Sequence, residues 1–261
     1  MLNMLYDWPK YYEVAFSFRD IPHEARFIRD CIRRFSAIPV RRVLEIGCGP
    51  APHAGELQSL GYQYTGLDIN RKMLAHAENK WRHLNPRPVL LESDMTSFEG
   101  VDRADFAYIL LGSLYLHSID EMNSHFDSVA KALNPGGLYF LDGCIQFSDP
   151  LGNNRDNAYT IEKDGITVSS EFAIELLDAD RQMYEEVWTV NVDDHGHKKK
   201  FEMVERNKSI EPTEFVGFIS QRPDFELVGW WQDWNFDRPI LRASNVTRPI
   251  ALVRRVASND R

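Results

Sequence analysis

Short apolar runs alternate with amphipathic segments through the first half of the chain. Five runs have the length and composition of buried strands: residues 43–46, 62–69, 89–91, 104–111 and 138–142. Between most of these runs, apolar residues recur at three- and four-residue steps, as in helices packed on a sheet: residues 54–60, 71–84 and 120–133. The alternation predicts an α/β fold with a doubly wound, Rossmann-like sheet that carries helices on both faces.

Aromatic residues gather ahead of these elements. Residues 11–38 have helical periodicity, and Pro39 ends the segment. Six aromatic side chains precede or open it: Tyr6, Trp8, Tyr11, Tyr12, Phe16 and Phe18. Two interpretations are open for residues 1–39: a helix packed on the domain, or an N-terminal helical lid over a small-molecule pocket.

After residue 145 the periodicity changes from helical to strict alternation. Three segments alternate apolar and polar residues and are separated by Asp-rich turns: residues 166–176, 183–192 and 201–206. Strands of this kind, joined by short turns, predict a small antiparallel sheet. We expect it to be a substrate-covering subdomain inserted at residues 146–210.

The end of the chain returns to the first pattern. Residues 213–221 suit a short helix, and residues 225–231 and 249–256 suit two closing strands joined by a long loop. The core is therefore expected to comprise residues 40–145 and 211–261. Its sheet is expected to have seven strands, the last of them antiparallel.

The first predicted strand ends in a glycine-rich turn. Gly47 and Gly49 follow its apolar run, and glycine can adopt the positive φ that a sharp turn needs while a ligand approaches the backbone. Pro50 and Pro52 suit the first turn of the next helix, whose free N–H groups favour a polar or anionic ligand. Asp68 ends the second strand about twenty residues further on, where a carboxylate can accept both hydroxyls of a ribose. These residues predict a nucleotide-type site.

Composition narrows the class of protein. The chain has 261 residues, 43% of them hydrophobic and 26% charged, which is typical of a globular core. Its net charge of −9 argues against a general nucleic-acid binder. The sequence shows no signal-peptide layout and no run of membrane-spanning length. Three cysteines suit neither a disulfide framework nor a zinc site, and no metal-ligand pattern is evident, so we expect a reduced, cytoplasmic protein without a metal.

Two cofactors compete for a glycine turn of this kind. A dinucleotide site needs Gly-x-Gly-x-x-Gly, and here the third glycine position is Pro52, whose ring and missing N–H suit that motif badly. An NAD(P)-dependent oxidoreductase is therefore the less favoured alternative. The string Glu45-x-Gly47-x-Gly49-x-Ala51 instead resembles motif I of the class I S-adenosylmethionine-dependent methyltransferases, with Ala51 where a third glycine is usual.

The resemblance extends over residues 40–145 and implies S-adenosylmethionine as the cofactor. Gly66-Leu-Asp-Ile69 is similar to the second-strand motif, which assigns Asp68 to the ribose. Ser93-Asp-Met95 is similar to the third-strand loop, which assigns Asp94 to the adenine amino group and Met95 to the ring. The resemblance also implies roles in cofactor binding for other residues on these motifs: Glu45, Gly47, the backbone N–H of Cys48, Gly49, Ala51, Ile69, Leu111 and Gly112.

The inserted sheet and aromatic N-terminus resemble small-molecule methyltransferases of the glycine and aminosugar N-methyltransferase type. By that likeness Tyr11 or Tyr12 contacts the cofactor, and Arg19 pairs with its methionine carboxylate, as a cation that stays charged should. The resemblance implies a small-molecule acceptor with an N or O nucleophile, and it slightly favours an amine. No nucleic-acid or membrane partner is expected, and the protein is expected to be a monomer or a homodimer. A methyltransferase-fold partner subunit without turnover is a further alternative.

In-line methyl transfer mainly needs a nucleophile held against the methyl group. His117, just past the fourth strand, could take a proton from that nucleophile, or it could simply be an exposed residue at a helix start. Tyr115 is the second catalytic candidate, as an aromatic wall beside the cationic sulfonium. The other aromatic candidates for that wall could equally belong to the core: Trp188, Trp230, Trp231 and Trp234.

Overall fold

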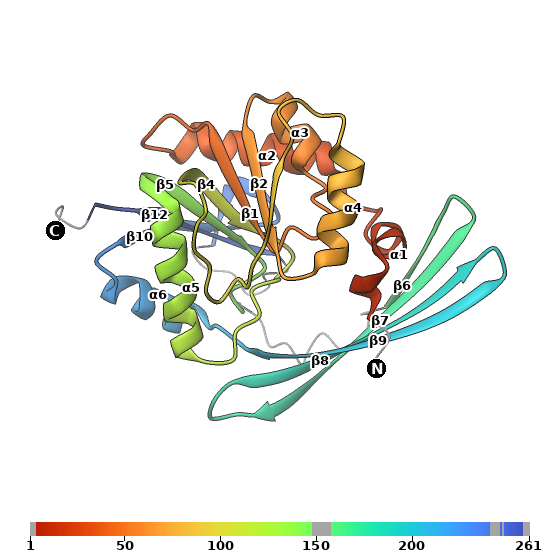
Figure 1. Ribbon diagram of the computed structural model, residues 1–261. Helices are drawn as coiled ribbons and strands as arrows, with labels where there is room; N and C mark the ends of the chain where they lie inside the picture. The colour runs from red at the N-terminus through yellow and green to blue at the C-terminus, as the bar shows by residue number, and fades with distance from the viewer. Residues whose placement is uncertain (1–3, 148–157, 241–245, 247, 258–261) are drawn as a thin grey trace.

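The computed structural model describes residues 4–147, 158–240, 246 and 248–257. Two sheets organise it (Figure 1). The central sheet has the strand order β11-β10-β12-β5-β4-β1-β2-β3. Its strands are β1 (Arg42–Ile46), β2 (Gln63–Asp68), β3 (Val89–Glu92), β4 (Ala104–Ile109), β5 (Leu133–Asp142), β10 (Phe225–Gln232), β11 (Asn235–Pro239) and β12 (Pro249–Arg255).

Strands β1 to β5 pair in parallel, and β10, β11 and β12 are antiparallel to their neighbours. This confirms the predicted Rossmann-like α/β fold, including its antiparallel last strand. One detail was wrong: the sheet has eight strands instead of seven. The extra strand, β11, lies within the predicted loop and pairs with β10 at one edge.

Helices cover both faces of the central sheet: α2 (Ile21–Phe35), α3 (Ala54–Ser59), α4 (Arg71–Trp81), α5 (Ile119–Ala132) and α6 (Pro212–Gln221). On one face, side chains of α2, α3 and α4 share a buried core with alternate strand residues such as Val43 and Phe106. On the other face, α5 and α6 pack against the intervening residues, such as Leu44 and Ala107. Helices therefore sandwich a sheet whose strands are buried on both sides.

The predicted single helix over residues 11–38 is in fact two helices. The chain forms η1 (Leu5–Asp7) and α1 (Pro9–Ala15), leaves the helical path, and restarts at α2. Asp20 is the N-cap of α2, because its side chain accepts a hydrogen bond from the backbone N–H of His23, and Pro22 lies in the first turn. The cap and the proline explain why the helix starts anew there.

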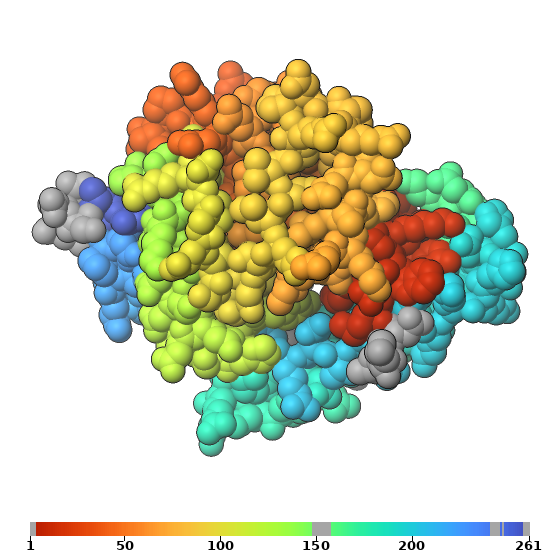
Figure 2. Space-filling view, viewed as in Figure 1, coloured from red at the N-terminus to blue at the C-terminus, as the bar shows by residue number. Residues whose placement is uncertain are grey.

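The inserted sheet consists of β6 (Ala158–Lys163), β7 (Ile166–Asp178), β8 (Met183–Asp194) and β9 (His197–Lys208), all antiparallel in that order. Three of these strands were predicted, and β6 is a fourth. One face is apolar and packs against η1 and α1 through residues such as Leu5, Val14, Val190 and Phe201. The N-terminal segment is thus wedged between the central domain and the inserted strands (Figure 2).

Among the helices of the described residues, none is long and apolar enough to cross a membrane.

Candidate active site

The turn after β1 adopts the backbone conformation that its glycines predicted. Gly47 and Gly49 have φ values of 66° and 51°. The N–H of Gly49 donates to Oδ2 of Asp68 over 2.7 Å, and the N–H of Cys48 donates to the carbonyl of Leu67 over 2.9 Å. The turn is therefore fastened to the end of β2.

Asp68 keeps capacity for a ligand despite this bond. Its Oδ1 accepts from the N–H of Asn70 over 2.8 Å, and the N–H of Ile69 also stabilises the charged form, so three backbone donors still leave part of the carboxylate's acceptor capacity for a ligand. Burial raises the pKa of Asp68, although the N–H groups of Asn70 and Gly49 partly oppose this by stabilising the charged form. Hydroxyl donors from a ligand would favour the carboxylate further.

A cavity of about 370 Å³ lies beside the turn. Its wall contains eight of the predicted site residues: Gly47, Gly49, Asp68, Ile69, Asp94, Met95, Tyr115 and His117. We call it the donor cavity. Tyr6 and Tyr12 complete its aromatic side. Tyr12 thus lines the cavity, whereas the hydroxyl of Tyr11 donates to Asp194 of the inserted sheet over 3.0 Å.

Hydrogen bonds hold the loop after β3, whose residues Asp94 and Met95 line the donor cavity. Asp94 Oδ1 accepts from both the N–H and the hydroxyl of Thr96, each over 2.8 Å. Burial lowers the pKa of His125 to about 4, so this imidazole is neutral. Its Nδ1 can then donate to the carbonyl of Met95 over 2.7 Å, while Nε2 accepts from the hydroxyl of Tyr139 over 2.9 Å. His125, which was not predicted, thereby positions Met95.

Glu45 lies beneath the turn in a buried polar network and does not line the donor cavity. Its Oε2 accepts from the hydroxyls of Tyr64 and Tyr108 over 2.5 and 2.9 Å, and its Oε1 lies 3.1 Å from His53 Nδ1. Glu24 contacts the other imidazole nitrogen, Nε2, over 2.9 Å. A histidine that donates to two carboxylates is an imidazolium. Although burial lowers the pKa of His53, the charge of Glu45 and the bonds to both carboxylates raise it overall.

Arg19 belongs to the same network. Its Nη2 lies 2.5 Å from Oε2 of Glu24, and its side chain is 8% exposed. Burial raises the pKa of Glu24, but hydrogen bonds from His53 and Arg19 outweigh burial and bring that pKa to about 2. In this arrangement the guanidinium is held by Glu24, so its predicted pairing with a cofactor carboxylate stays a prediction.

Two predicted residues of the glycine turn do not line the donor cavity. The N–H of Cys48 is engaged by the carbonyl of Leu67, its side chain is buried, and burial raises the pKa of its thiol, which stays protonated. Ala51 is buried at a φ of 50°, and its carbonyl accepts from the indole N–H of Trp81 over 2.8 Å. Both residues hold the turn in place.

Leu111 and Gly112 line a second cavity, of about 260 Å³, which we call the distal cavity. Both have positive φ, and the N–H of Leu111 donates to Oδ2 of Asp142 over 3.0 Å. Tyr115 lines both cavities, so this residue lies at their common border. Burial raises the pKa of Tyr115, so its phenol stays protonated at neutral pH.

His117 has features of both predicted alternatives, a residue at the site and an exposed residue at a helix start. It lines the donor cavity, and it lies next to Ser118, the N-cap of α5, with its side chain 55% exposed. Its Nδ1 lies 3.1 Å from Oε2 of Glu121, which also accepts from its backbone N–H. The free edge of the ring can therefore still meet a ligand.

The four tryptophans have different surroundings. Trp231 and Trp234 are buried in the core beneath α2, and Trp230 packs edge-on against Phe147. Trp188 lies on the inserted sheet against Tyr6 and Tyr12, which line the donor cavity. Core packing is thus the role of the first three, and Trp188 backs the cavity wall.

Two carboxylates were missed. Glu186 lines the distal cavity, and Glu205 lines the donor cavity. Each occupies the apolar phase of its strand: Glu186 alternates with Trp188 and Val190, and Glu205 with Met203. A charged residue in an apolar register was the available sequence signal.

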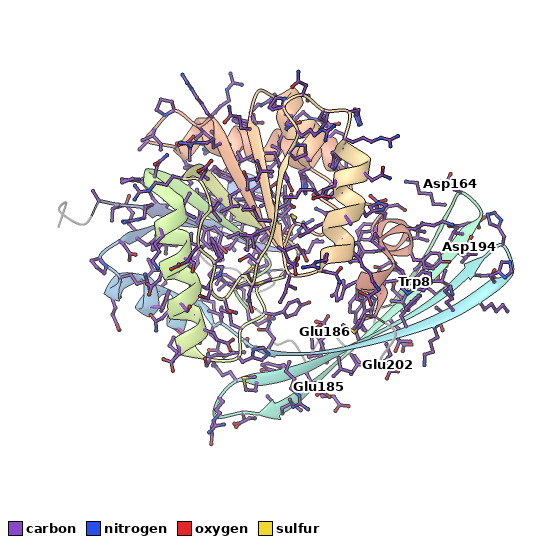
Figure 3. The ribbon with its side chains drawn as sticks, viewed as in Figure 1. Trp8, Asp164, Glu185, Glu186, Asp194 and Glu202 are labelled. Atoms are coloured by element: carbon purple, nitrogen blue, oxygen red, sulfur yellow. The ribbon has the colours of Figure 1, made fainter. Side chains whose placement is uncertain are left out.

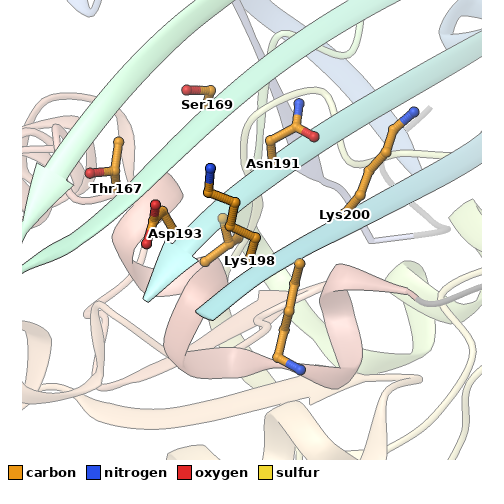
Figure 4. Close-up of a pocket in the computed structure, with 8 residues that line it drawn as sticks. Thr167, Ser169, Asn191, Asp193, Lys198 and Lys200 are labelled. Carbon is orange, nitrogen blue, oxygen red and sulfur yellow. The ribbon is translucent and has the colours of Figure 1, made fainter. Parts of the chain in front are cut away.

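A separate groove of about 470 Å³ lies on the outer face of the inserted sheet (Figure 4). Polar and lysine side chains line it, including Thr167, Asn191, Lys198 and Lys200. These residues belong to the strand phase opposite to the apolar face, so the groove is separate from the glycine turn.

Comparison with known proteins agrees with this geometry. Residues 43–137, from β1 to the middle of β5, match the methyltransferase-domain family. Residues 43–137 therefore carry a methyltransferase domain. A methyltransferase-like protein of Geobacillus sp. (strain WCH70) is 28% identical over 126 residues, which are 47% of this chain and 51% of that protein. The protein YqeM of Bacillus subtilis (strain 168) is 32% identical over 104 residues, which are 39% of this chain and 41% of YqeM. The chain thus spans about half the length of the curated relatives it matches, and the matches centre on the methyltransferase domain.

Solved structures extend the fold similarity beyond this domain. An S-adenosylmethionine-dependent methyltransferase from Clostridium acetobutylicum ATCC 824 superposes with a TM-score of 0.76 at 17% identity, over 95% of this chain and 96% of that one. An amino pentose methyltransferase from Micromonospora echinaspora superposes with a TM-score of 0.71 at 19% identity, over 94% of this chain and 97% of that one. A sugar N-methyltransferase from Streptoalloteichus sp ATCC 53650 has the same TM-score and identity, over 94% of this chain and 93% of that one. The similarity to these solved structures therefore covers the inserted sheet as well as the methyltransferase domain.

Proposed function

We propose that this protein transfers a methyl group from S-adenosylmethionine to a nitrogen or oxygen nucleophile of a small molecule. One observation carries the proposal. The donor cavity combines the glycine turn, Asp68 and Asp94, and at Tyr115 it meets a second cavity where an acceptor could lie. A donor site that adjoins an acceptor site is what a two-substrate transfer requires.

Several features of the donor cavity support an adenosyl ligand. A Cβ added at Gly47 would lie 3.6 Å from Cε of Met95, and one added at Gly49 would lie 4.0 Å from the ring of Tyr12. Side chains at these positions would fill space between the turn and its facing wall. Ile69, an apolar residue in that wall, is 67% exposed, and an adenine ring would cover it. These features support a cofactor between Asp68 and Asp94.

S-adenosylmethionine, when bound, supplies a methyl group activated by its sulfonium. The chain would then mainly orient the two substrates and exclude water. Tyr6, Tyr12 and Tyr115 surround the donor cavity with aromatic surface, which tolerates a positive charge. Because burial raises the pKa of all three phenols, none of them becomes a competing anion at neutral pH.

An acceptor amine or hydroxyl must lose a proton during transfer. We propose His117 as the group that takes it, because its imidazole lines the donor cavity and its Nδ1 is held by Glu121. Tyr115, whose phenol stays protonated, would position the acceptor at the junction of the cavities and would not act as a base.

An amine is the favoured acceptor. Two of the structurally similar proteins are an amino pentose methyltransferase and a sugar N-methyltransferase, which supports a nitrogen nucleophile here. Incubation with methyl-labelled S-adenosylmethionine and a panel of amino sugars, small amines and matched alcohols tests the function. We expect a labelled product whose mass has increased by one methylene unit. A chain that binds S-adenosylhomocysteine but labels no small molecule would instead support a partner subunit without turnover.

A further inference from the structure

The apolar face of the inserted sheet contains two carboxylates side by side. Glu186 of β8 and Glu205 of β9 are directly opposite each other in the antiparallel register. Figure 3 shows Glu186 on the side of the sheet that faces the central domain, with Glu185 and Glu202 on the other side. The next cross-strand pair on the inner face is Trp188 with Met203, both buried. Two acids thus lie beside a buried, largely apolar part of this face.

This arrangement is unfavourable without a positive partner. Like charges directly opposite each other destabilise a sheet, and their Cβ atoms lie about 4.5–5.5 Å apart in such pairs. Burial raises the pKa of both carboxyls, and the charge of Glu205 raises that of Glu186 further. Within the described part of the chain, neither carboxylate forms an ion pair or a hydrogen bond with a side chain or backbone group. A protonated His117 would lower the pKa of Glu205, but its imidazole is paired with Glu121.

A second group on the same face also lacks a partner. Trp188, two residues along β8 from Glu186, is 5% exposed, and its indole N–H has no hydrogen-bond partner among the described residues. Its ring packs against Tyr6 and Tyr12 of the donor-cavity wall. A buried donor without an acceptor costs free energy, so this face of the sheet holds an unsatisfied donor as well as two unpaired acids.

The two carboxylates lie where acceptor and donor must meet. Glu205 lines the donor cavity, Glu186 lines the distal cavity, and Tyr115 lines both. The charge of each glutamate also acts on the phenol of Tyr115, which places all three groups near one another. The pair therefore flanks the junction at which a nucleophile would face the methyl donor.

We propose that Glu186 and Glu205 together bind the protonated amino group of the methyl acceptor, and so select small cationic amines over neutral analogues. The inference rests on the proposed methyl transfer. An ammonium group has several N–H donors, and two carboxylates can share them. The bound ammonium has no lone pair, so it gives one proton to His117, and the resulting neutral amine then attacks the methyl group with S-adenosylhomocysteine as the leaving group. An organic cation is favoured over a metal ion, because the described residues contain no cluster of three His, Cys, Asp or Glu side chains that could hold a metal.

The test compares charge-removing variants with a matched control. Glu186→Gln and Glu205→Gln keep the shape of each side chain and remove its charge. Glu202→Gln removes a charge from the outer face of β9, where the side chain is 48% exposed. The probes are glucosamine and ethanolamine, each with its neutral N-acetyl counterpart. Calorimetry on protein saturated with S-adenosylhomocysteine measures probe binding, and labelled S-adenosylmethionine measures transfer.

We expect the wild type to prefer each amine over its N-acetyl counterpart by at least about tenfold, the scale of one hydrogen bond to a charged group. Each cavity variant should lose at least about tenfold in kcat/KM for the amine, with S-adenosylhomocysteine affinity unchanged within about twofold. Glu202→Gln should match the wild type.

Equal or tighter binding of the neutral probes, or cavity variants that match the wild type, would overturn the carboxylate site. No binding of either amine by protein that binds S-adenosylhomocysteine would also overturn it. Amine binding that depends on both glutamates but is followed by no transfer would contradict the proposed function and leave the cation site standing.

Discussion

The backbone N–H of Gly49 donates a hydrogen bond to Oδ2 of Asp68 over 2.7 Å. The carboxylate at the end of β2 thereby fixes the turn at the end of β1 before any ligand binds. Because its remaining lone pairs are free for a ribose, one residue both shapes the turn and contributes to ligand binding. Preorganisation of this kind lowers the cost of ordering the site on binding.

Asp94→Ala is expected to remove recognition of the adenine amino group. Asp94 Oδ1 is committed to Thr96, which leaves Oδ2 to accept from the ligand. The wild type should prefer S-adenosylhomocysteine over S-inosylhomocysteine by about 1.5–3 kcal/mol, and the variant should bind both alike. Competitive calorimetry with the two ligands measures the difference. A variant that still prefers the adenosyl ligand would remove Asp94 from this role.

Gly66→Ala should destabilise the protein and disturb the glycine turn. A Cβ at this position would lie 2.7 Å from Sγ of Cys48 and 3.0 Å from the hydroxyl of Tyr64. Overpacking of this kind costs about 1–3 kcal/mol, and the displaced Cys48 should also weaken S-adenosylhomocysteine binding. Gly217→Ala is the matched control, because in α6 the added Cβ meets nothing within 4 Å, and it should stabilise by roughly 0.5–1 kcal/mol. Urea unfolding of both variants tests the contrast, which equal stabilities would refute.

The network of Arg19, Glu24 and His53 predicts a window of maximal contribution to stability. The lowered pKa of Glu24 means that its contribution is present above the usual glutamate pKa and is lost as pH falls through about 2. The raised pKa of His53 means that its contribution is present below the usual histidine pKa and is lost as pH rises through the raised value. Both contributions are present between about pH 4.5 and 6.5.

Glu24→Gln should therefore lower the free energy of unfolding most in this window, by about 3–5 kcal/mol, because it leaves buried charges unpaired. Chemical unfolding at several pH values measures the effect. Glu99→Gln removes a surface pair with Lys131 and should change little at any pH. A pH-independent difference for Glu24→Gln would show that the buried charges do not act as described.

His117→Ala is expected to lower kcat by about 100-fold or more if the imidazole takes the acceptor's proton. S-adenosylhomocysteine affinity should stay within about twofold, since the side chain is not assigned to the cofactor. The pH profile of kcat should change shape in the variant. His117→Gln can still donate to Glu121, so recovery of activity in that variant would assign His117 to holding the loop instead.

Apolar periodicity was enough to predict strands that are buried along their whole length, such as β1 and β4, and helices with one buried face, such as α5. It did not predict β11, because Asn235–Pro239 contains one buried apolar side chain, Phe236, and pairs only through the neighbouring edge of β10. Nor did it predict the break before α2, which depends on a capping bond between Asp20 and His23. Edge pairing and caps are tertiary or single-bond effects that periodicity does not contain.

The candidate site likewise contains residues that local sequence motifs predict and residues that only the fold brings together. Gly47, Gly49 and Asp68 lie on short motifs at strand ends, and parallel strands bring such ends to one edge of the sheet. Glu45 has the motif position but serves a buried network with Glu24 and His53, whose bonds join residues far apart in the sequence. Only the folded chain places these side chains together.

The central claim is tested most directly by titrating the full chain with S-adenosylhomocysteine in a calorimeter, beside Asp68→Ala and with NAD as a second ligand. Charged hydrogen bonds to ribose hydroxyls should be worth about 1.5–3 kcal/mol. We therefore predict saturable binding to the wild type, binding at least about tenfold weaker to a variant that is folded by circular dichroism, and no binding of NAD. Absence of S-adenosylhomocysteine binding to the wild type, or equal affinity in the folded variant, would contradict the account.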